Sequence, residues 1–237
     1  GWIIDTIRGT LELPPHWIAR LDEIFDYLRG RDRVGLSKWQ KILGELRSMS
    51  LGVPGSRGLF STLQDGLRFT DHDRIRLTDQ MHDQLSDFEY LTNELSTRPT
   101  AIAEIVPDDP VAVGPHDASG LGIGGVWLPA TTHSNLQPTL WRERFATDIM
   151  ENLVSFKNPH GTVNNSQLEF AGGLAHQDVL VQAFDCAGRT IAPLGDNTPS
   201  GVWHHKGSAT GSGITSCLLG MNSLHQRHYC YLAKESY

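Results

Sequence analysis

The sequence predicts an α+β chain: a short β-hairpin and a helical bundle, followed by an α/β domain built on a mixed sheet. Three observations predict this. Apolar residues recur at helical spacing from about residue 15 to residue 97. Prolines then interrupt residues 99–110, which makes a helix there unfavourable. Beyond them, apolar runs alternate with glycines, a pattern typical of strands joined by tight turns. We therefore expect two parts that meet near residue 100.

The N-terminal segment, residues 1–14, is typical of a hairpin. Trp2 to Ile7 is rich in apolar residues, Arg8-Gly9 supplies a turn, and Thr10 to Leu13 forms a returning strand. Two prolines follow and stop the sheet.

Residues 15–98 are predicted to form four helices with one apolar face each. The second should begin at Ser37, where Ser-x-x-Gln offers a capping box with Gln40. The third covers about Leu59 to Phe69. The faces of the first and fourth helices comprise Ile18, Leu21, Ile24, Phe25 and Leu28, and Ile75, Leu77, Met81, Leu85, Phe88, Leu91 and Leu95.

Basic residues on the first two helices are candidates for contact with phosphate. Lys38 and Lys41 are the two that we select, within a strip that also holds Arg29, Arg31, Arg33, Arg47 and Arg57. A solvated helical surface with screened ion pairs explains the strip equally well. The net charge of −7 argues mildly against a nucleic-acid-binding protein, because duplex-binding domains are usually basic.

The segment around Asp117 places one acid at the end of an apolar strand, before a glycine-rich turn into a second strand. Gly120, Gly122 and Gly125 match the G-x-G-x-x-G fingerprint of dinucleotide sites. That fingerprint requires a helix after its last glycine, whereas Val-Trp-Leu-Pro follows here. An ordinary hairpin whose Asp caps a turn is the simplest interpretation of this segment alone.

Two further acids suit a metal site. Glu169 is predicted on a helix, at the border of a buried stripe formed by Leu168, Ala171, Ala175 and Val179. Asp196 follows a short apolar run and precedes Pro199, which suits the first turn of a helix. Two strand ends and an intervening helix would then present three carboxylates. Such an all-oxygen setting is what Mg²⁺ prefers.

These motifs resemble the ribonuclease H domain of retroelement reverse transcriptases, and most of all that of DIRS-like elements. The resemblance rests on Asp-Ala-Ser with its glycine hairpin, Asn-Ser-x-Leu-Glu on a helix, and Asp-Asn-Thr before "VWHHKGS". It implies a ribonuclease H-like endonuclease that hydrolyses the RNA strand of RNA–DNA hybrids with two Mg²⁺ ions, for which Mn²⁺ can substitute.

The resemblance also implies roles for individual residues and segments. Asp117, Glu169 and Asp196 match three of the family's four catalytic metal ligands, with Asp117 between both ions. Asn165 matches a hybrid-contacting asparagine, and Ser119 and Asn197 are further nucleic-acid-binding candidates in the same motifs. Residues 1–14 resemble a primer grip, 15–98 a thumb, 99–110 a linker and 111–237 the ribonuclease H-like domain. We expect the fourth ligand beyond residue 237.

The same family supplies the expected partners. These are an RNA–DNA hybrid or template–primer duplex and the fingers and palm of the polyprotein, since the Tyr-x-Asp-Asp polymerase motif is absent from this sequence. Two alternatives stay open: an inactive or degenerate ribonuclease H-like module that only binds nucleic acid, and an actin-like or sugar-kinase-type ATP-binding domain, which also uses Asp-x-Ser beside a glycine hairpin.

The composition indicates in which cellular environment the protein is expected to occur. The sequence has no apolar run long enough to cross a membrane. Its three cysteines are widely spaced and form no C-x-x-C, which favours reduced thiols in an intracellular protein, cytoplasmic or nuclear. His225 and His228 lie three residues apart on a predicted helix, but no acid or cysteine joins them at metal spacing.

Overall fold

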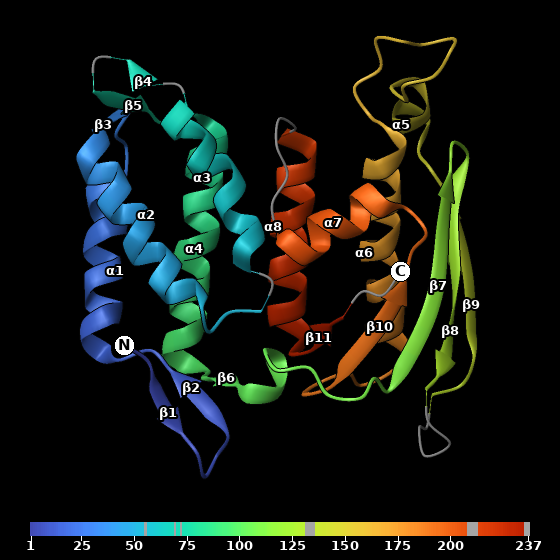
Figure 1. Cartoon of the computed structure of the whole chain (residues 1–237), viewed down its shortest axis with the longest axis horizontal. Helices are drawn as coiled ribbons and strands as arrows, with labels where there is room; N and C mark the ends of the chain where they lie inside the picture. The colour runs from blue at the N-terminus through green and yellow to red at the C-terminus, as the bar shows by residue number, and fades with distance from the viewer. Residues whose placement is uncertain (55, 69, 72, 131–135, 208–212, 235–237) are drawn as a thin grey trace. The chain divides into compact units, whose positions relative to one another are not determined.

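The computed structural model describes residues 1–54, 56–68, 70–71, 73–130, 136–207 and 213–234 (Figure 1). Its contacts divide the chain into two compact units. The first comprises Gly1–Ile105 with Ser208–Arg227, and the second comprises Val106–Gly207 with His228–Tyr237. The predicted mixed α+β architecture is confirmed. The placement of a C-terminal segment in the first unit was not anticipated.

The first unit begins with the predicted hairpin. Strands β1 (Ile3–Asp5) and β2 (Thr10–Glu12) pair antiparallel, and Gly9 takes the left-handed conformation (φ 64°) that the turn between them requires. Strand β6 (Thr100–Ala101) pairs with β2 and completes a three-stranded sheet. The 3₁₀ turn Ile102–Glu104 follows β6 directly, so the proline-rich segment starts as ordered backbone.

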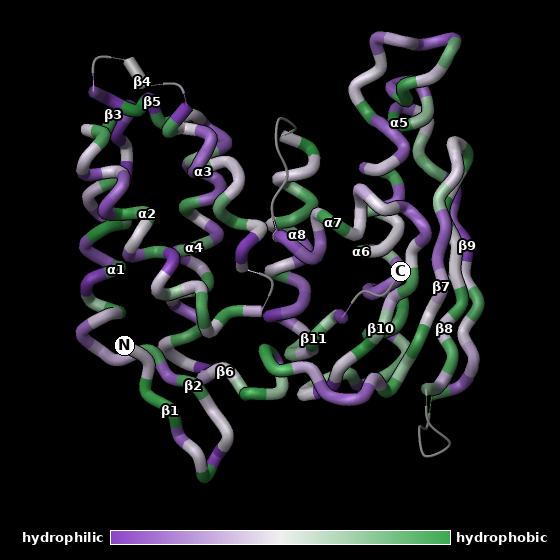
Figure 2. The backbone as a smooth tube through the Cα atoms, in the orientation of Figure 1, coloured by the Kyte–Doolittle hydropathy of each residue, from purple (hydrophilic) through white to green (hydrophobic). Residues whose placement is uncertain are grey.

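Helices make up most of the first unit. They are α1 (Pro15–Leu28), α2 (Leu36–Ser50), α3 (Ser61–Asp65), α4 (Asp79–Thr97) and α8 (Gly213–Tyr229). Hydrophilic and hydrophobic residues alternate along α1, α2 and α4, as expected for helices with one buried face (Figure 2). These faces bury Ile24, Trp39, Leu46, Phe88 and Leu91 almost completely.

The starts of the second and fourth helices differ from the prediction. Helix α2 begins at Leu36 with Gly35 as its N-cap, and no side-chain capping bond forms, so Ser37 and Gln40 make no capping box. Ile75 lies in a strand and Leu77 precedes Thr78, whose hydroxyl caps α4. Thr78 supplies the helix start that the apolar spacing alone did not reveal.

The predicted third helix is broken into three short turns. A 3₁₀ turn (Ser56–Phe60) leads into α3, and a second 3₁₀ turn (Gly66–Arg68) follows. Phe69, the predicted end, lies outside the described residues. A small sheet that was not predicted has the order β3 (Arg33–Gly35), β5 (Arg74–Arg76), β4 (Thr70–Asp71).

The second unit is built on a five-stranded mixed sheet with the order β11–β10–β7–β8–β9, from left to right in Figure 1. The strands are β7 (Ala112–Ser119), β8 (Gly122–Pro129), β9 (Thr139–Arg144), β10 (Thr190–Leu194) and β11 (Leu232–Ala233). β7, β8 and β9 form an antiparallel meander, whereas β10 runs parallel to both β7 and β11. Numbered in their order along the chain, these strands lie in the order 3-2-1-4-5, reading from β9 to β11.

Within the described residues, the helices of this unit are α5 (Thr147–Glu151), α6 (Asn165–Ala183) and α7 (Thr198–Lys206). α6 packs on one face of the sheet, where Trp127 stacks on His176 with ring centroids 4.1 Å apart. Within the described residues, no helix is both long and apolar enough to span a membrane.

Candidate metal centre

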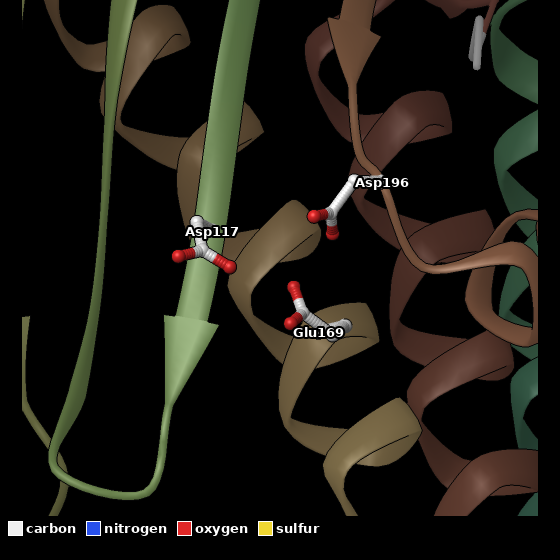
Figure 3. A group of neighbouring side chains, drawn as sticks. All are labelled: Asp117, Glu169 and Asp196. Atoms are coloured by element: carbon white, nitrogen blue, oxygen red, sulfur yellow. The ribbon is translucent and has the colours of Figure 1, made fainter.

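The three predicted acids come together in the second unit, from three different elements. Asp117 lies on β7, Glu169 lies one turn into α6, and Asp196 lies between β10 and α7 (Figure 3). One carboxylate oxygen of each lies within 4.8 Å of the corresponding oxygens of the other two. Asp117 and Asp196 are exposed, whereas Glu169 is buried.

The sheet register creates the space that Glu169 occupies. β7 pairs with β10 from Ala112 to Pro115, and the pairing stops at Leu194. Beyond that point, among the residues that the structure describes, no strand pairs with β7 on the β10 side. Ala118 donates its backbone N–H to Glu169 Oε2 at 3.2 Å instead. The divergence of two parallel strands therefore admits a helix side chain beside Asp117.

The surroundings of Glu169 disfavour its ionised form. Burial, followed by the charges of Asp117 and Asp196, raises the pKa of Glu169 to about 7. The N–H of Ala118 and the amide of Asn165 oppose this shift. Three carboxylates with one buried member form a set that a hard divalent cation would neutralise and hold through oxygen atoms.

Glu169 belongs to the buried face of α6 rather than to its border, which corrects our prediction. Only Leu168 of the predicted stripe is fully buried. The helix is instead covered on two sides, because Gly172 and His176 face the sheet while Phe170 stacks on His204 of α7 at 4.1 Å. A helix enclosed in this way shows no single apolar stripe.

The position of Asp117 also differs from the prediction. Asp117 lies two residues before the end of β7 and pairs with Gly124. The turn itself comprises only Gly120 and Leu121, since Ser119 already pairs with Gly122. Gly122, Gly124 and Gly125 all lie within β8, so the dinucleotide fingerprint opens no helix.

Asp196 is positioned by a helix cap and a buried histidine. Asn197 is the N-cap of α7, and its side chain accepts a hydrogen bond from Ser200 N at 3.0 Å. Pro199 occupies the first turn, as predicted. Gly195 packs against His116, because a Cβ there would lie 3.3 Å from the imidazole ring. His116 was not predicted as part of the site, although this residue directly precedes Asp117.

The remaining candidate residues are placed as follows. Asn165 opens α6, and its amide lies 3.5 Å from Glu169 Oε1. The Ser119 hydroxyl lies 3.3 Å from Gly122 O, within the β7–β8 turn. Lys38 and Lys41 lie on α2 in the first unit, where the Lys38 ammonium is 5.0 Å from the centre of the Tyr27 ring.

Comparison with known proteins yields structural neighbours alone. No protein-family model matches the chain, and no curated protein matches it in sequence. Solved structures that resemble it include a foamy viral protease-reverse transcriptase dRH with double-stranded DNA (12% identity, TM-score 0.36), the foamy viral protease-reverse transcriptase with double-stranded DNA (11%, 0.37) and the same protein with an RNA/DNA hybrid (12%, 0.36). All of this chain is covered, but only 37%, 44% and 28% of those chains.

Proposed function

We propose that the second unit is a metal-dependent nuclease that hydrolyses the RNA strand of RNA–DNA hybrids, as part of a DIRS-like retroelement reverse transcriptase. The convergence of Asp117, Glu169 and Asp196 on one point carries this proposal. The motif resemblance supports it, and so does the mixed five-stranded sheet that the resemblance led us to expect.

Asp117, Glu169 and Asp196 would together hold two Mg²⁺ ions through their carboxylate oxygens. Pairs of divalent cations supply Lewis acidity and nucleophile activation in phosphodiester hydrolysis. The protein itself fixes the geometry: Ala118 N–H orients Glu169, and the Asn197 cap holds the turn that carries Asp196. Asn165, beside Glu169, would contact the hybrid.

Cleavage of a hybrid tests the proposal. The full-length protein is incubated with an RNA–DNA hybrid labelled on the RNA strand, in Mg²⁺ or in EDTA. We expect cleavage of the RNA strand only with Mg²⁺, and its loss in Asp196→Asn. Asp185→Asn is the matched control, because Asp185 is an exposed acid of the same unit, in the loop that precedes β10. Cleavage that survives in both Asp196→Asn and Asp117→Asn would refute the assignment.

A hybrid-binding protein without cleavage is the outcome that would favour an inactive module. Binding would then be retained in wild type and in Asp196→Asn, while no RNA product forms in Mg²⁺ or Mn²⁺. The two readouts separate a catalytic centre from a surface that only binds nucleic acid.

A further inference from the structure

The open face of the sheet carries two arginines in line with the acid cluster. In an antiparallel sheet, residues that pair directly across strands project to the same face. Arg142 of β9 pairs with Gly124 of β8, which pairs with Asp117 of β7. In the next such row, Arg144 pairs with Gly122, and Gly122 pairs with Ser119. Both arginines therefore project from the face that bears Asp117.

The opposite face is the one that α6 covers. His116, Gly125 and Trp141 form a row on that side, and Trp141 Nε1 donates to His176 Nδ1 of α6 at 2.7 Å. Strand alternation then places Asp117 and Arg142 on the outer side. Exposure agrees, since Asp117, Ser119, Arg142 and Arg144 are all exposed.

The two guanidinium groups are available for an anion. Neither Arg142 nor Arg144 forms an ion pair with any residue in the described ranges. Glu143, between them, pairs with Ile123 and so projects to the α6 face, and its Oε1 accepts from Arg144 N at 3.1 Å.

The strand between the arginines and the acids carries no side chains in these two rows. Gly122 and Gly124 leave bare backbone between β9 and β7. Neighbouring strands lie about 4.8 Å apart, so the Cα atoms of Arg142 and Asp117 are separated by about 10 Å. Arg142 and Arg144 are themselves about 6.7 Å apart along β9, which is comparable to the spacing of successive phosphates on one nucleic-acid strand.

We infer that Arg142, Arg144 and the floor of Gly122 and Gly124 form a track for the sugar–phosphate backbone of a nucleic-acid strand that enters the acid cluster. The guanidinium group of arginine can donate two parallel hydrogen bonds to the oxygens of one phosphate. The glycine floor lets the backbone lie flat against the sheet. This inference deepens the proposed function, on which it rests, by identifying the residues that hold the substrate beside Asp117.

Salt-dependent binding tests the track. A fluorescent RNA–DNA hybrid is titrated in Mg²⁺ with Asp196→Asn, in which hydrolysis is blocked, and with the same protein carrying Arg142→Ala, Arg144→Ala or both. We expect weaker binding, and a salt slope that falls by about 0.7–0.9 for each arginine that contacts a phosphate. Arg142→Lys should retain most of the slope. Arg189→Ala is the matched control, since Arg189 is exposed just before the start of β10, whereas Asp196 follows its end.

The outcomes separate this inference from the proposed nuclease. An unchanged slope in the double arginine variant overturns the track, while RNA cleavage by the unaltered protein would leave the nuclease standing. Arginine-dependent binding without any cleavage by the unaltered protein would overturn the nuclease and leave the track standing. Absence of hybrid binding overturns both. Self-association that Leu140→Ser abolishes would also overturn the track, because Leu140 is 83% exposed on this face and a second copy would then cover it.

Discussion

Ala118 donates its backbone N–H to Glu169 Oε2 at 3.2 Å, at the point where β7 has lost its pairing with β10. This bond joins a strand to a helix that begins 46 residues after that strand ends. It also orients a buried carboxylate toward two exposed ones. Ala118 N–H therefore holds Glu169 in place, so a substitution of Glu169 that keeps an acceptor for this N–H should leave the fold intact.

The first prediction concerns metal-linked stability. Glu169→Gln keeps an acceptor for Ala118 N–H but removes a buried charge that the two aspartates repel. In EDTA at pH 8 the variant should be at least as stable as wild type. Mg²⁺ should stabilise wild type, by about 2.7 kcal/mol at a hundred times its Kd, and the variant much less. Thermal denaturation with and without Mg²⁺ measures both effects.

A matched control uses another glutamate of the same unit. Glu151 is exposed at the end of α5, so Glu151→Gln should keep the full response to Mg²⁺. Equal stabilisation of Glu169→Gln and wild type by Mg²⁺ would contradict a metal site at Glu169.

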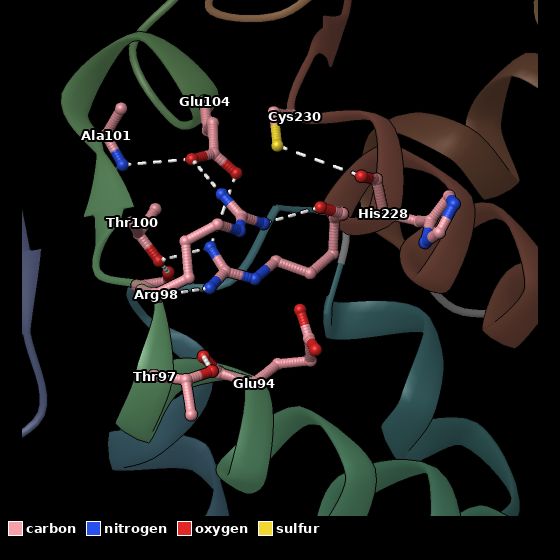
Figure 4. Close-up of polar contacts among 10 residues, drawn as sticks. Glu94, Thr97, Arg98, Thr100, Ala101, Glu104, His228 and Cys230 are labelled. Atoms are coloured by element: carbon pink, nitrogen blue, oxygen red, sulfur yellow. Dashed lines mark hydrogen bonds and ion pairs between the residues drawn. The ribbon is translucent and has the colours of Figure 1, made fainter.

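The second prediction concerns a buried ion cluster in the first unit (Figure 4). Glu104 accepts from Arg98 at 2.9 Å and from Arg227 of α8 at 3.3 Å, and the side chains of Glu104 and Arg227 are each 1% exposed. Arg227 also donates to Thr100 Oγ1 at 3.0 Å. Glu104→Gln leaves buried guanidinium charge without a carboxylate, which should cost about 3–5 kcal/mol.

An exposed pair provides the comparison. Arg29 and Glu89 lie 2.8 Å apart with 64% and 39% of their side chains exposed. Because such pairs contribute about 0–1 kcal/mol, Glu89→Gln should shift the urea midpoint little. Similar losses for Glu104→Gln and Glu89→Gln in urea denaturation would show that the buried cluster adds no special stability.

The third prediction concerns acid sensitivity. Burial, and then the charge of His116, lowers the pKa of His176 from 6.5 to about 3. Trp141 Nε1 donates to Nδ1, so the ring proton is on Nε2 and points to Gly114 O, 3.1 Å away. The folded state holds this ring neutral. The unfolded chain binds the proton below pH 6.5, so stability from His176 is complete above pH 6.5 and is lost as the pH falls toward 3.

The loss should amount to about 2 kcal/mol between pH 6.5 and pH 5. His176→Gln cannot take up this proton, and its unfolding free energy should therefore change less over that interval, whatever its stability at pH 7. Urea denaturation at the two pH values measures the difference. Equal pH dependence in the variant and wild type would refute a neutral buried His176.

The sequence was sufficient to predict that Asp117, Glu169 and Asp196 come together, because the motif resemblance singled out all three, although Asp117 lies inside β7 and Glu169 inside α6. Pro199 after Asp196 indicates a helix start, and the structure has that helix. Helix α8 shows the limit of such patterns. Its buried positions include Thr215, Ser216, Asn222, Ser223, Gln226 and Arg227. A helix buried through polar residues carries no apolar periodicity, so neither its membership of the first unit nor the bond from Arg227 to Glu104 could be predicted.

Arg142 and Arg144 were missed for a related reason. The segment Thr139–Arg144 is an edge strand with one half-buried tryptophan and few other apolar residues facing the core, so it lacks the alternation that identifies a strand. The two rows of the track depend on the register between β8 and β9, which no local pattern specifies.

The last prediction concerns two glycines that face the same helix–sheet interface. A Cβ at Gly172 of α6 would meet Ile123 and Ala118 at 3.4 and 3.7 Å, which are ordinary contact distances. Packing therefore does not require glycine at position 172. Since alanine is favoured over glycine inside a helix by about 0.8–1.0 kcal/mol, Gly172→Ala should stabilise the protein. A Cβ at Gly114 of β7 would instead overlap the His176 ring and Trp127.

Gly114→Ala must displace a stacked pair of rings and the hydrogen bond from His176 to Gly114 O, so it should destabilise the protein by about 1–3 kcal/mol. Urea denaturation of both variants measures whether each substitution raises or lowers the free energy of unfolding. Destabilisation by Gly172→Ala would mean that α6 lies closer to β7 and β8 than these distances indicate. The spacing of Glu169 from Asp117 would then need revision as well, because Glu169 lies less than one turn from Gly172 on the same helix.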